Sequence, residues 1–394
     1  MEVGDGRTLD VWYGDGPGSP RTSPAEALRL AGFERVAPHR VTLGWTLEHH
    51  DWLDDPNMCG RALIAGYALR RPVAQRRLTS LAVRLSAVAS LIAADPPDVA
   101  IVAGVRRGDR LAFGAAVGWA DALVRFAGRV VVEVDEDGAD LGAPLIEGNV
   151  VATVSRPPVE VARVADGRAA DAVDLAIGER VCRLLPDDAT LQFGPGGIGE
   201  GIVRALDRPV RIVSGIATDA VADLDARGLL AEPAVAGYAW GDEPVRQLAA
   251  DGMLRLAPSS VTHDLTALSA IPCFVACNTA LQVGLDGSVN IERVGGRVIT
   301  SIGGHPDFCV GSSRSRGGMS IIAVRSTVAD GTSTIVPVVE VVSTQRSDVD
   351  LVVTEHGVAD LRGAGDEERA DRLIAIAAPE HRAGLQVAAH RSRR

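Results

Sequence analysis

The chain has 394 residues, 46% of them apolar, and is therefore long enough for two or three folded domains. Its net charge of −11 argues against nucleic acid or an anionic membrane as a partner, because both require a basic surface. The five cysteines lack the paired spacing of zinc sites or disulfide frameworks, and no apolar run is long enough to span a membrane. We therefore expect a cytoplasmic protein with small-molecule ligands and without a bound metal.

Helix and strand signals alternate between residues 74 and 136. Apolar residues recur at helical spacing over 74–94, and an apolar strand bounded by Pro and Gly follows at 97–105. A second helix is predicted over 118–127 and a second strand over 128–136. This alternation is typical of βαβ units and predicts a mostly parallel sheet.

A second series of the same kind begins with an amphipathic helix at 169–185 and continues with a strand, a glycine loop and a helix at 189–206. The boundary is expected between residues 155 and 170, so we predict two α/β domains, 1–160 and 161–394. Further apolar strands are predicted over 208–215, 273–285, 319–324, 334–339 and 350–357, and a late helix over 365–378.

The segment LQFGPGGIGEGI, residues 191–202, is the first candidate for chemistry. Its glycines, including Gly194, Gly196 and Gly197, stand between a strand and a helix. Without side chains there, backbone N–H groups can approach an anion at the helix N-terminus. Glycine loops of this sort are equally often tight turns, so an anion or thioester site and a structural turn both stay open.

A second glycine-rich segment, SIGGHPDFCVGSSRSRGGMSIIAV, covers residues 301–324. The glycine pairs 303–304 and 317–318 flank Asp307, Arg314 and Arg316. The segment offers close backbone donors together with charges, which suits a ligand that carries phosphate.

Three motifs resemble the acetyl-CoA hydrolase/transferase family of class I CoA-transferases, which includes 4-hydroxybutyrate CoA-transferases. These are GGHPDF at 303–308, SRGGMSIIAV at 315–324 and VVTEHGVADLRG at 352–363. Weaker matches extend the resemblance in order from about residue 80 to 385. The resemblance implies two open α/β domains of the CoA-transferase type with the site at their interface. It also implies a homodimer that uses coenzyme A or acyl-CoA as a substrate, together with a small carboxylic acid or other acyl acceptor, and has no permanently bound cofactor.

The resemblance also implies a mechanism. In this family a glutamate attacks the thioester, forms an acyl-glutamyl anhydride and then becomes a glutamyl-CoA thioester, while backbone N–H groups stabilise the oxyanion. Gly303 and Gly304 stand at the loop that matches the oxyanion donors. The residues expected to line the CoA pocket are Gly194, Gly196, Gly197, Gly303, Gly304, Asp307, Arg316, Gly317 and Gly318.

The family's glutamate belongs to a stretch that aligns with residues 278–287, where its place is taken by Gln282. An amide oxygen is a far weaker nucleophile than a carboxylate, and loss of a covalent nucleophile typically costs several powers of ten in rate. The family's first strand and glycine loop also have no clear counterpart in the N-terminal sequence, so the first domain is expected to be shortened at its start.

Three hypotheses follow from these residues. The first is an enzyme of acyl-CoA metabolism that resembles CoA-transferases. The second is a thioester hydrolase or direct acyl transferase with His305 as general base, because the usual pKa of histidine lies near neutrality. The third is a catalytically silent homologue that binds acyl-CoA.

Overall fold

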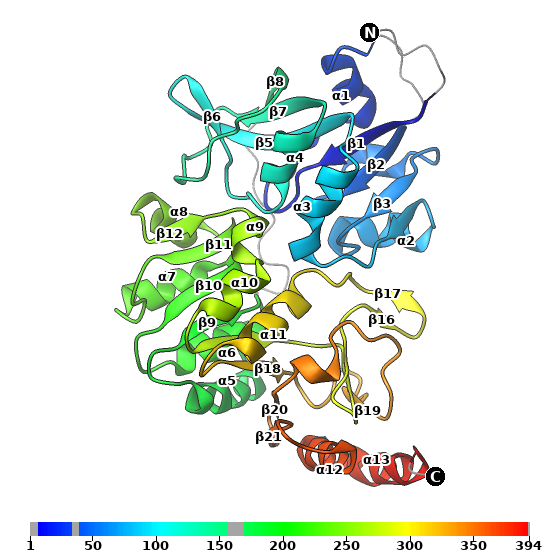
Figure 1. Ribbon diagram of the computed structural model, residues 1–394, viewed down its shortest axis with the longest axis vertical. Helices are drawn as coiled ribbons and strands as arrows, with labels where there is room; N and C mark the ends of the chain where they lie inside the picture. The colour runs from blue at the N-terminus through cyan, green and yellow to red at the C-terminus, as the bar shows by residue number, and fades with distance from the viewer. Residues whose placement is uncertain (1–6, 34–38, 157–168, 393–394) are drawn as a thin grey trace. The chain divides into compact units, whose positions relative to one another are not determined.

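The computed structural model describes residues 7–33, 39–156 and 169–392, and the chain divides into two compact units (Figure 1). The first unit consists of the N-terminal part of the chain together with residues 235–262 and 298–303. The second unit contains most of the remainder, from about residue 164 to the C-terminus. The predicted domain boundary at 160–161 lies outside the described residues. Both units are mixed α/β, which confirms the predicted fold class.

The first unit is built on a sheet whose strands lie in the order β4-β3-β2-β1-β5-β7-β8. Every pairing along this path is parallel, and the short β6 adds to β5 in the antiparallel direction. The central strands are buried along most of their length, because parallel sheets have both faces covered. The strand bounds are β1 Leu9–Tyr13, β2 His39–Leu43, β3 Gly60–Ala62, β4 Leu78–Ser80, β5 Val99–Arg107, β6 Arg110–Ala112, β7 Arg129–Asp135 and β8 Val150–Arg156.

The helices of the first unit are short. The α-helices are α1 Pro24–Leu30, α2 Arg70–Ala74, α3 Leu85–Ala94 and α4 Ala120–Phe126, and the 3-10 helices are η1 Asp51–Asp54 and η2 Tyr67–Leu69. The later segment of this unit adds β11 Ala234–Ala239, α8 Glu243–Ala250, β12 Leu254–Leu256 and α9 Ser259–Thr262.

The N-terminus differs from the sequence prediction. A first strand is present as β1, and the loop that follows it, residues 14–18, contains three glycines. Gly16 and Gly18 have φ of +90° and +71°, a region that side chains disfavour. The strand escaped prediction because it has only five residues and one of them is Asp10. The sequence prediction therefore missed β1 and the glycine loop, while the expectation that the first domain is shortened at its start stays a prediction.

The sheet of the second unit includes six strands in the order β10-β9-β13-β18-β20-β21. The first five are parallel to their neighbours, and β21 closes the edge in the antiparallel direction. The bounds are β9 Thr190–Phe193, β10 Arg211–Ala217, β13 Phe274–Asn278, β18 Met319–Ala323, β20 Leu351–Thr354 and β21 Gly357–Asp360.

The helices of the second unit include α5, which is fixed at its start by a reciprocal capping box between Asp171 and Asp174. A Cβ atom on Gly178 of α5 would lie 2.4 Å from the backbone of Gly201 of α6, so the two helices pack with their backbones in contact. The bounds are α5 Ala172–Leu184, α6 Gly197–Ala205, α7 Asp219–Ala226, α10 Leu265–Ala270, α11 His305–Arg314, η3 Arg346–Asp348, α12 Asp366–Ile376 and α13 Pro379–Ser392.

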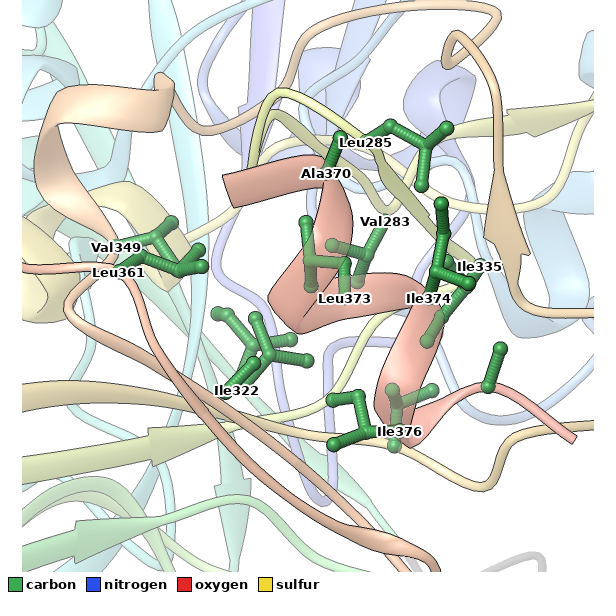
Figure 2. Close-up of a cluster of buried hydrophobic side chains, with 14 of the residues drawn as sticks. Val283, Leu285, Ile322, Ile335, Val349, Leu361, Ala370, Leu373, Ile374 and Ile376 are labelled. Atoms are coloured by element: carbon green, nitrogen blue, oxygen red, sulfur yellow. The ribbon is translucent and has the colours of Figure 1, made fainter. Parts of the chain in front are cut away.

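A buried apolar cluster joins α12 to two small strands of the second unit. Figure 2 shows Leu373 and Ile374 of α12 directed toward Val283 and Ile335. These strands belong to a three-stranded sheet of β15 Val289–Asn290, β14 Gln282–Gly284 and β19 Ile335–Val336, and a two-stranded ribbon consists of β16 Arg293–Val294 and β17 Arg297–Val298.

Two predicted elements are divided in the structure. The predicted helix over 74–94 exists only as α3, because residues 78–80 form strand β4. The predicted strand over 273–285 is broken after Asn278, and its second part, β14, joins the small sheet. The remaining predicted strands are present at 99–107, 129–135, 190–193, 211–217, 319–323, 335–336 and 351–354.

Truncation of the buried cluster should destabilise the second unit. Leu373 is fully buried, and Leu373→Ala removes apolar contact and leaves a cavity, which typically costs roughly 2–5 kcal/mol. Denaturant unfolding measures the loss. The control is Val338→Ala, because Val338 is 80% exposed and its truncation should change stability by less than about 0.5 kcal/mol. Equal effects of the two substitutions would contradict this description of the core.

Candidate functional site

A cavity of about 230 Å³ opens at the carboxyl edge of the second sheet. Its walls are the loop 193–199 after β9, residues 277–279 at the end of β13, and Asp174 and Arg325. The chain runs from β9 to β10 on one side and from β13 to β18 and β20 on the other. The cavity therefore lies at the point where strand order reverses, which is where ligands bind in open parallel sheets.

The glycine loop lines this cavity with backbone N–H groups that have no partner within the helix they begin. Gly196 precedes α6 with φ of +113°, and no side chain caps the helix. The Glu200 N–H begins the helical pattern by donating to the Gly196 carbonyl at 3.0 Å. Residues 197–199 come before this first helical hydrogen bond. Their N–H groups therefore have no partner within the helix, as is usual in the first turn. Together with the helix dipole, they favour an anion or a polarised carbonyl oxygen.

The charged groups of the cavity neutralise one another. Asp174 is 1% exposed and accepts a hydrogen bond of 3.0 Å from Nε of Arg325. Arg325 also pairs with Asp171, whose hydrogen bond raises the pKa of the guanidinium. Asp174 is the only carboxylate among the described lining residues, and it is already engaged. A carboxylate free to attack a bound thioester is therefore not part of the described wall.

His305 does not line the cavity, but its ring contacts Thr279, a residue of the cavity wall. Its Nε2 lies 3.1 Å from the carbonyl oxygen of Thr279, and its Nδ1 lies 2.8 Å from Oγ1 of Thr344. A carbonyl oxygen can only accept, so Nε2 carries the proton and Nδ1 accepts from the threonine hydroxyl. Burial lowers the pKa of His305 to about 4. The ring is thus neutral near pH 7, and both of its nitrogens are occupied.

Gln282 does not line the cavity. It lies three residues after Thr279, at the start of β14, opposite Asn290 in the small sheet. Nδ2 of the fully buried Asn290 donates to Oε1 of Gln282 at 2.8 Å and to the carbonyl oxygen of Arg293 at 2.6 Å. The amide oxygen of Gln282 is therefore held, and its NH2 group is the part that remains to donate to a ligand.

The glycine pair 303–304 lies where the chain passes between the two units. Gly303 has φ of +59° and accepts a hydrogen bond of 3.1 Å from the Leu85 N–H within the first unit. Gly304 is the N-cap of α11 in the second unit. Asp307 is fully buried in the first turn of the same helix, where a carboxylate favours the helix N-terminus.

The structure does not bring Arg316, Gly317 and Gly318 to the cavity. They form the turn that precedes β18, where the Arg316 carbonyl accepts from the Cys273 N–H at 2.9 Å. That turn lies at the amino edge of the sheet, about 16 Å from the carboxyl edge for a five-residue strand. A Cβ atom on Gly318 would lie 2.3 Å from the carbonyl oxygen of Phe274, which gives this glycine a packing role.

Several wall residues were missed by sequence reasoning. Asn278 is the last residue of β13, Thr279 follows it, and Arg325 lies two residues beyond the end of β18. Their position after apolar strands was the available signal, because the carboxyl ends of parallel strands share one edge. Cys277 also lines the cavity, but burial raises its pKa well above the usual range, which argues against a reactive thiolate.

Residues 245–389 match the family model of the acetyl-CoA hydrolase/transferase C-terminal domain. The C-terminal part of the chain is thus similar to that family's C-terminal domain. It is 27% identical to the butyryl-CoA:acetate CoA-transferase of Anaerostipes caccae over 68% of this chain and 66% of that protein. It is 32% identical to the 4-hydroxybutyrate coenzyme A transferase of Clostridium kluyveri over 54% of this chain and 53% of that protein. The aligned part thus spans about half to two thirds of these relatives.

Solved structures share the fold over a greater length. RipA from Yersinia pestis superposes with a TM-score of 0.86, 24% identity and coverage of 98% of this chain and 94% of that one. A 4-hydroxybutyrate CoA-transferase from Porphyromonas gingivalis gives a TM-score of 0.75 at 25% identity, with the same coverage. The likeness in fold to these two structures therefore extends over both units.

Two features are absent from the described ranges. No helix there is long and apolar enough to cross a bilayer. No group of three or more His, Cys, Asp or Glu side chains in the same ranges is placed to hold a metal ion.

His305 should remain neutral across the physiological pH range. Its folded-state pKa of about 4 lies below the value of about 6.5 expected for an unfolded chain. Between these values the unfolded chain binds more protons, so this group's contribution to stability is complete above about pH 6.5 and is lost as the pH falls toward 4. An NMR titration of the ring resonances, assigned with His305→Asn, measures this pKa. A midpoint near 6.5 would refute this environment, in which the ring is half-buried and both of its nitrogens are hydrogen bonded.

Proposed function

We propose that the protein is an enzyme of acyl-CoA metabolism that uses an acyl-CoA and a small carboxylic acid, or another acyl acceptor, as substrates. The observation that carries the proposal is the cavity at the reversal point of the second sheet, walled by uncapped glycine-loop amides. Such donors suit the anionic and carbonyl oxygens of a CoA thioester. Relatives in the family carry names of CoA-transferases and acetyl-CoA hydrolases, which supports the same substrate class.

In this proposal Gly194, Gly196 and Gly197 contact the thioester or its phosphates. The roles of Gly303 and Gly304 as oxyanion donors, and of Asp307 in the CoA site, rest on the family resemblance. Arg316, Gly317 and Gly318 are supported as CoA residues by the resemblance alone, since their turn lies at the other edge of the sheet.

The proposed role of Gln282 is to donate rather than to attack. Asn290 holds its amide oxygen, so the NH2 group can hydrogen bond to a carbonyl or carboxylate oxygen of the substrate. An amide cannot pass through the anhydride and thioester intermediates of the family mechanism. Classical ping-pong transfer by Gln282 is for this reason the least supported part of the proposal.

A second candidate function is binding of acyl-CoA without turnover. The observation that favours it is the pairing of Asp174 with Arg325, which leaves the described wall without a free carboxylate. The hydrolase alternative with His305 as base has less support. Thr344 and Thr279 occupy both ring nitrogens, and the low pKa of about 4 makes the ring a weak base.

A cytoplasmic location and a homodimer also belong to the proposal. They are supported by the acidic composition and by the family resemblance, respectively.

One assay separates these functions. The purified protein is incubated with a panel of short acyl-CoAs, with and without acetate, while free thiol and exchanged acyl-CoA are followed together. Exchange without thiol release supports the transferase, and thiol release supports a hydrolase. Silence combined with measurable acyl-CoA affinity supports the binder. Silence without affinity for any acyl-CoA would contradict the proposal.

Filling the cavity from the glycine loop should abolish acyl-CoA binding. A Cβ atom on Gly194 meets no atom within 4 Å, so Gly194→Leu extends into open space without displacing the protein. We expect at least a tenfold loss of acyl-CoA affinity by calorimetry, with the melting temperature nearly unchanged. Gly384→Leu is the matched control, because Gly384 is exposed on α13 and is also free of neighbours. Unchanged affinity in Gly194→Leu would show that the cavity is not the CoA site.

The Gln282→Glu variant tests whether residue 282 stands at the position of the family's nucleophilic glutamate. Asn290 Nδ2 can donate to a carboxylate as it does to the amide, so Gln282→Glu should fold normally. If residue 282 is that place, the variant gains CoA exchange and forms a glutamyl-CoA adduct that is detectable by mass and cleaved by borohydride. Gln386→Glu, at an exposed position of α13, is the control and should form no adduct. A folded Gln282→Glu protein without an adduct would place the nucleophile elsewhere.

A further inference from the structure

The cavity at the edge of the second sheet offers no free positive charge. Arg325 is the only basic residue among its described lining residues, and Asp174 is the only acidic one. The Arg325 guanidinium is paired with both Asp174 and Asp171. A phosphate group would therefore add negative charge beside two carboxylates that already share one guanidinium. This balance favours an uncharged part of the ligand over its phosphates.

Much of the buried part of the wall is apolar. Phe193, Ile202 and Cys277 line the cavity, and each is at most 4% exposed. A buried free cysteine behaves as a small apolar group. Ile198 lines the cavity as well and lies four residues before Ile202 on α6, so the two side chains share one face of the helix. The half-buried Ile198 thus continues the apolar surface toward the glycine loop.

Backbone donors stand beside this apolar surface. Gly194 and Gly196 leave open space where side chains would stand. The N–H groups of residues 197–199 have no partner within the helix. The carbonyl oxygen of a thioester requires donors, and the chain attached to it requires an apolar surface. The cavity provides the two side by side.

We propose that this cavity holds the acyl chain of the CoA ester and selects apolar acyl groups of roughly six to eight carbons. The inference rests on the proposed function, because it assigns the acyl end of that substrate. A cavity of about 150 Å³ holds benzene, so a cavity of about 230 Å³ has room for a larger group. The thioester carbonyl occupies part of this volume, next to the loop amides.

The first unit contains a smaller cavity with different properties. It measures about 80 Å³ and is lined by residues of β5 and of the loop after β1. Arg156 is paired there with Glu133 and Asp135. Its volume is about half of that needed for benzene, which excludes an acyl chain of the proposed size. The assignment therefore concerns the cavity of the second unit.

Calorimetry with a series of CoA esters tests the size of the acyl site. All members carry the same CoA, so differences in affinity report on the acyl group. Burial of each methylene raises affinity roughly fourfold, and hexanoyl-CoA should therefore bind at least about tenfold more tightly than acetyl-CoA. Decanoyl-CoA should bind no more tightly than octanoyl-CoA, because the cavity is then full.

The Ile198→Asn variant tests the location of the site. A carboxamide on the apolar face should reduce the preference for hexanoyl-CoA over acetyl-CoA at least about threefold, because the chain then faces a polar group. Affinity for acetyl-CoA should stay nearly unchanged, and Ile198→Val should keep the preference. Val387→Asn is the matched control, because Val387 is 53% exposed on α13 and does not line the cavity.

The outcomes separate this inference from the proposed function. Equal affinity for acetyl-CoA and hexanoyl-CoA would overturn the acyl assignment and leave the proposed function standing. An unchanged preference in a folded Ile198→Asn protein would also overturn it, and so would affinity that keeps rising from octanoyl-CoA to decanoyl-CoA. The absence of affinity for every CoA ester would contradict the proposed function itself.

Discussion

The reversal of strand order in each parallel sheet is the constraint on which the rest of the structure depends. Crossover helices lead away from the reversal point on both sides, so the carboxyl ends of the two strands that flank it are left uncovered. In the second unit these ends belong to β9 and β13, and in the first unit to β1 and β5. Each uncovered edge coincides with a cavity, and each cavity is entered by a glycine loop.

Glycine serves two different purposes at these edges. Gly178 and Gly201 allow α5 and α6 to pack backbone against backbone, which fixes the helix that follows the loop 194–199. Gly194 and Gly196 have open space where a side chain would stand, so they leave room for a ligand. Gly318 resembles them in sequence, yet its Cβ would collide with Phe274, and its turn lies at the opposite edge. Glycine content alone does not separate a packing role from a binding role.

Sequence predicted most core strands, because apolar runs that alternate with helices are typical of a parallel sheet. It failed where tertiary pairing decided the outcome. The run 273–285 is mostly apolar, but its second half pairs with β15 and β19 under the cover of α12, so Gln282 leaves the main sheet. The glycine loop at 194–197 was found from its composition. Arg325 and Asp174 were not, because their contact joins residues 151 positions apart.

The polar groups around the larger cavity restrict the chemistry that its described wall can perform. The carboxylate of Asp174 is committed to Arg325, the His305 ring is neutral and doubly bonded, and the Cys277 thiol is protonated by burial. What remains is a set of fixed donors from the backbone and, next to the wall, the amide of Gln282. Donors of this kind bind and polarise a thioester without attacking it. Under the proposed function, turnover at this edge requires that the attacking oxygen come from the acceptor itself, as a carboxylate or water brought against the polarised carbonyl.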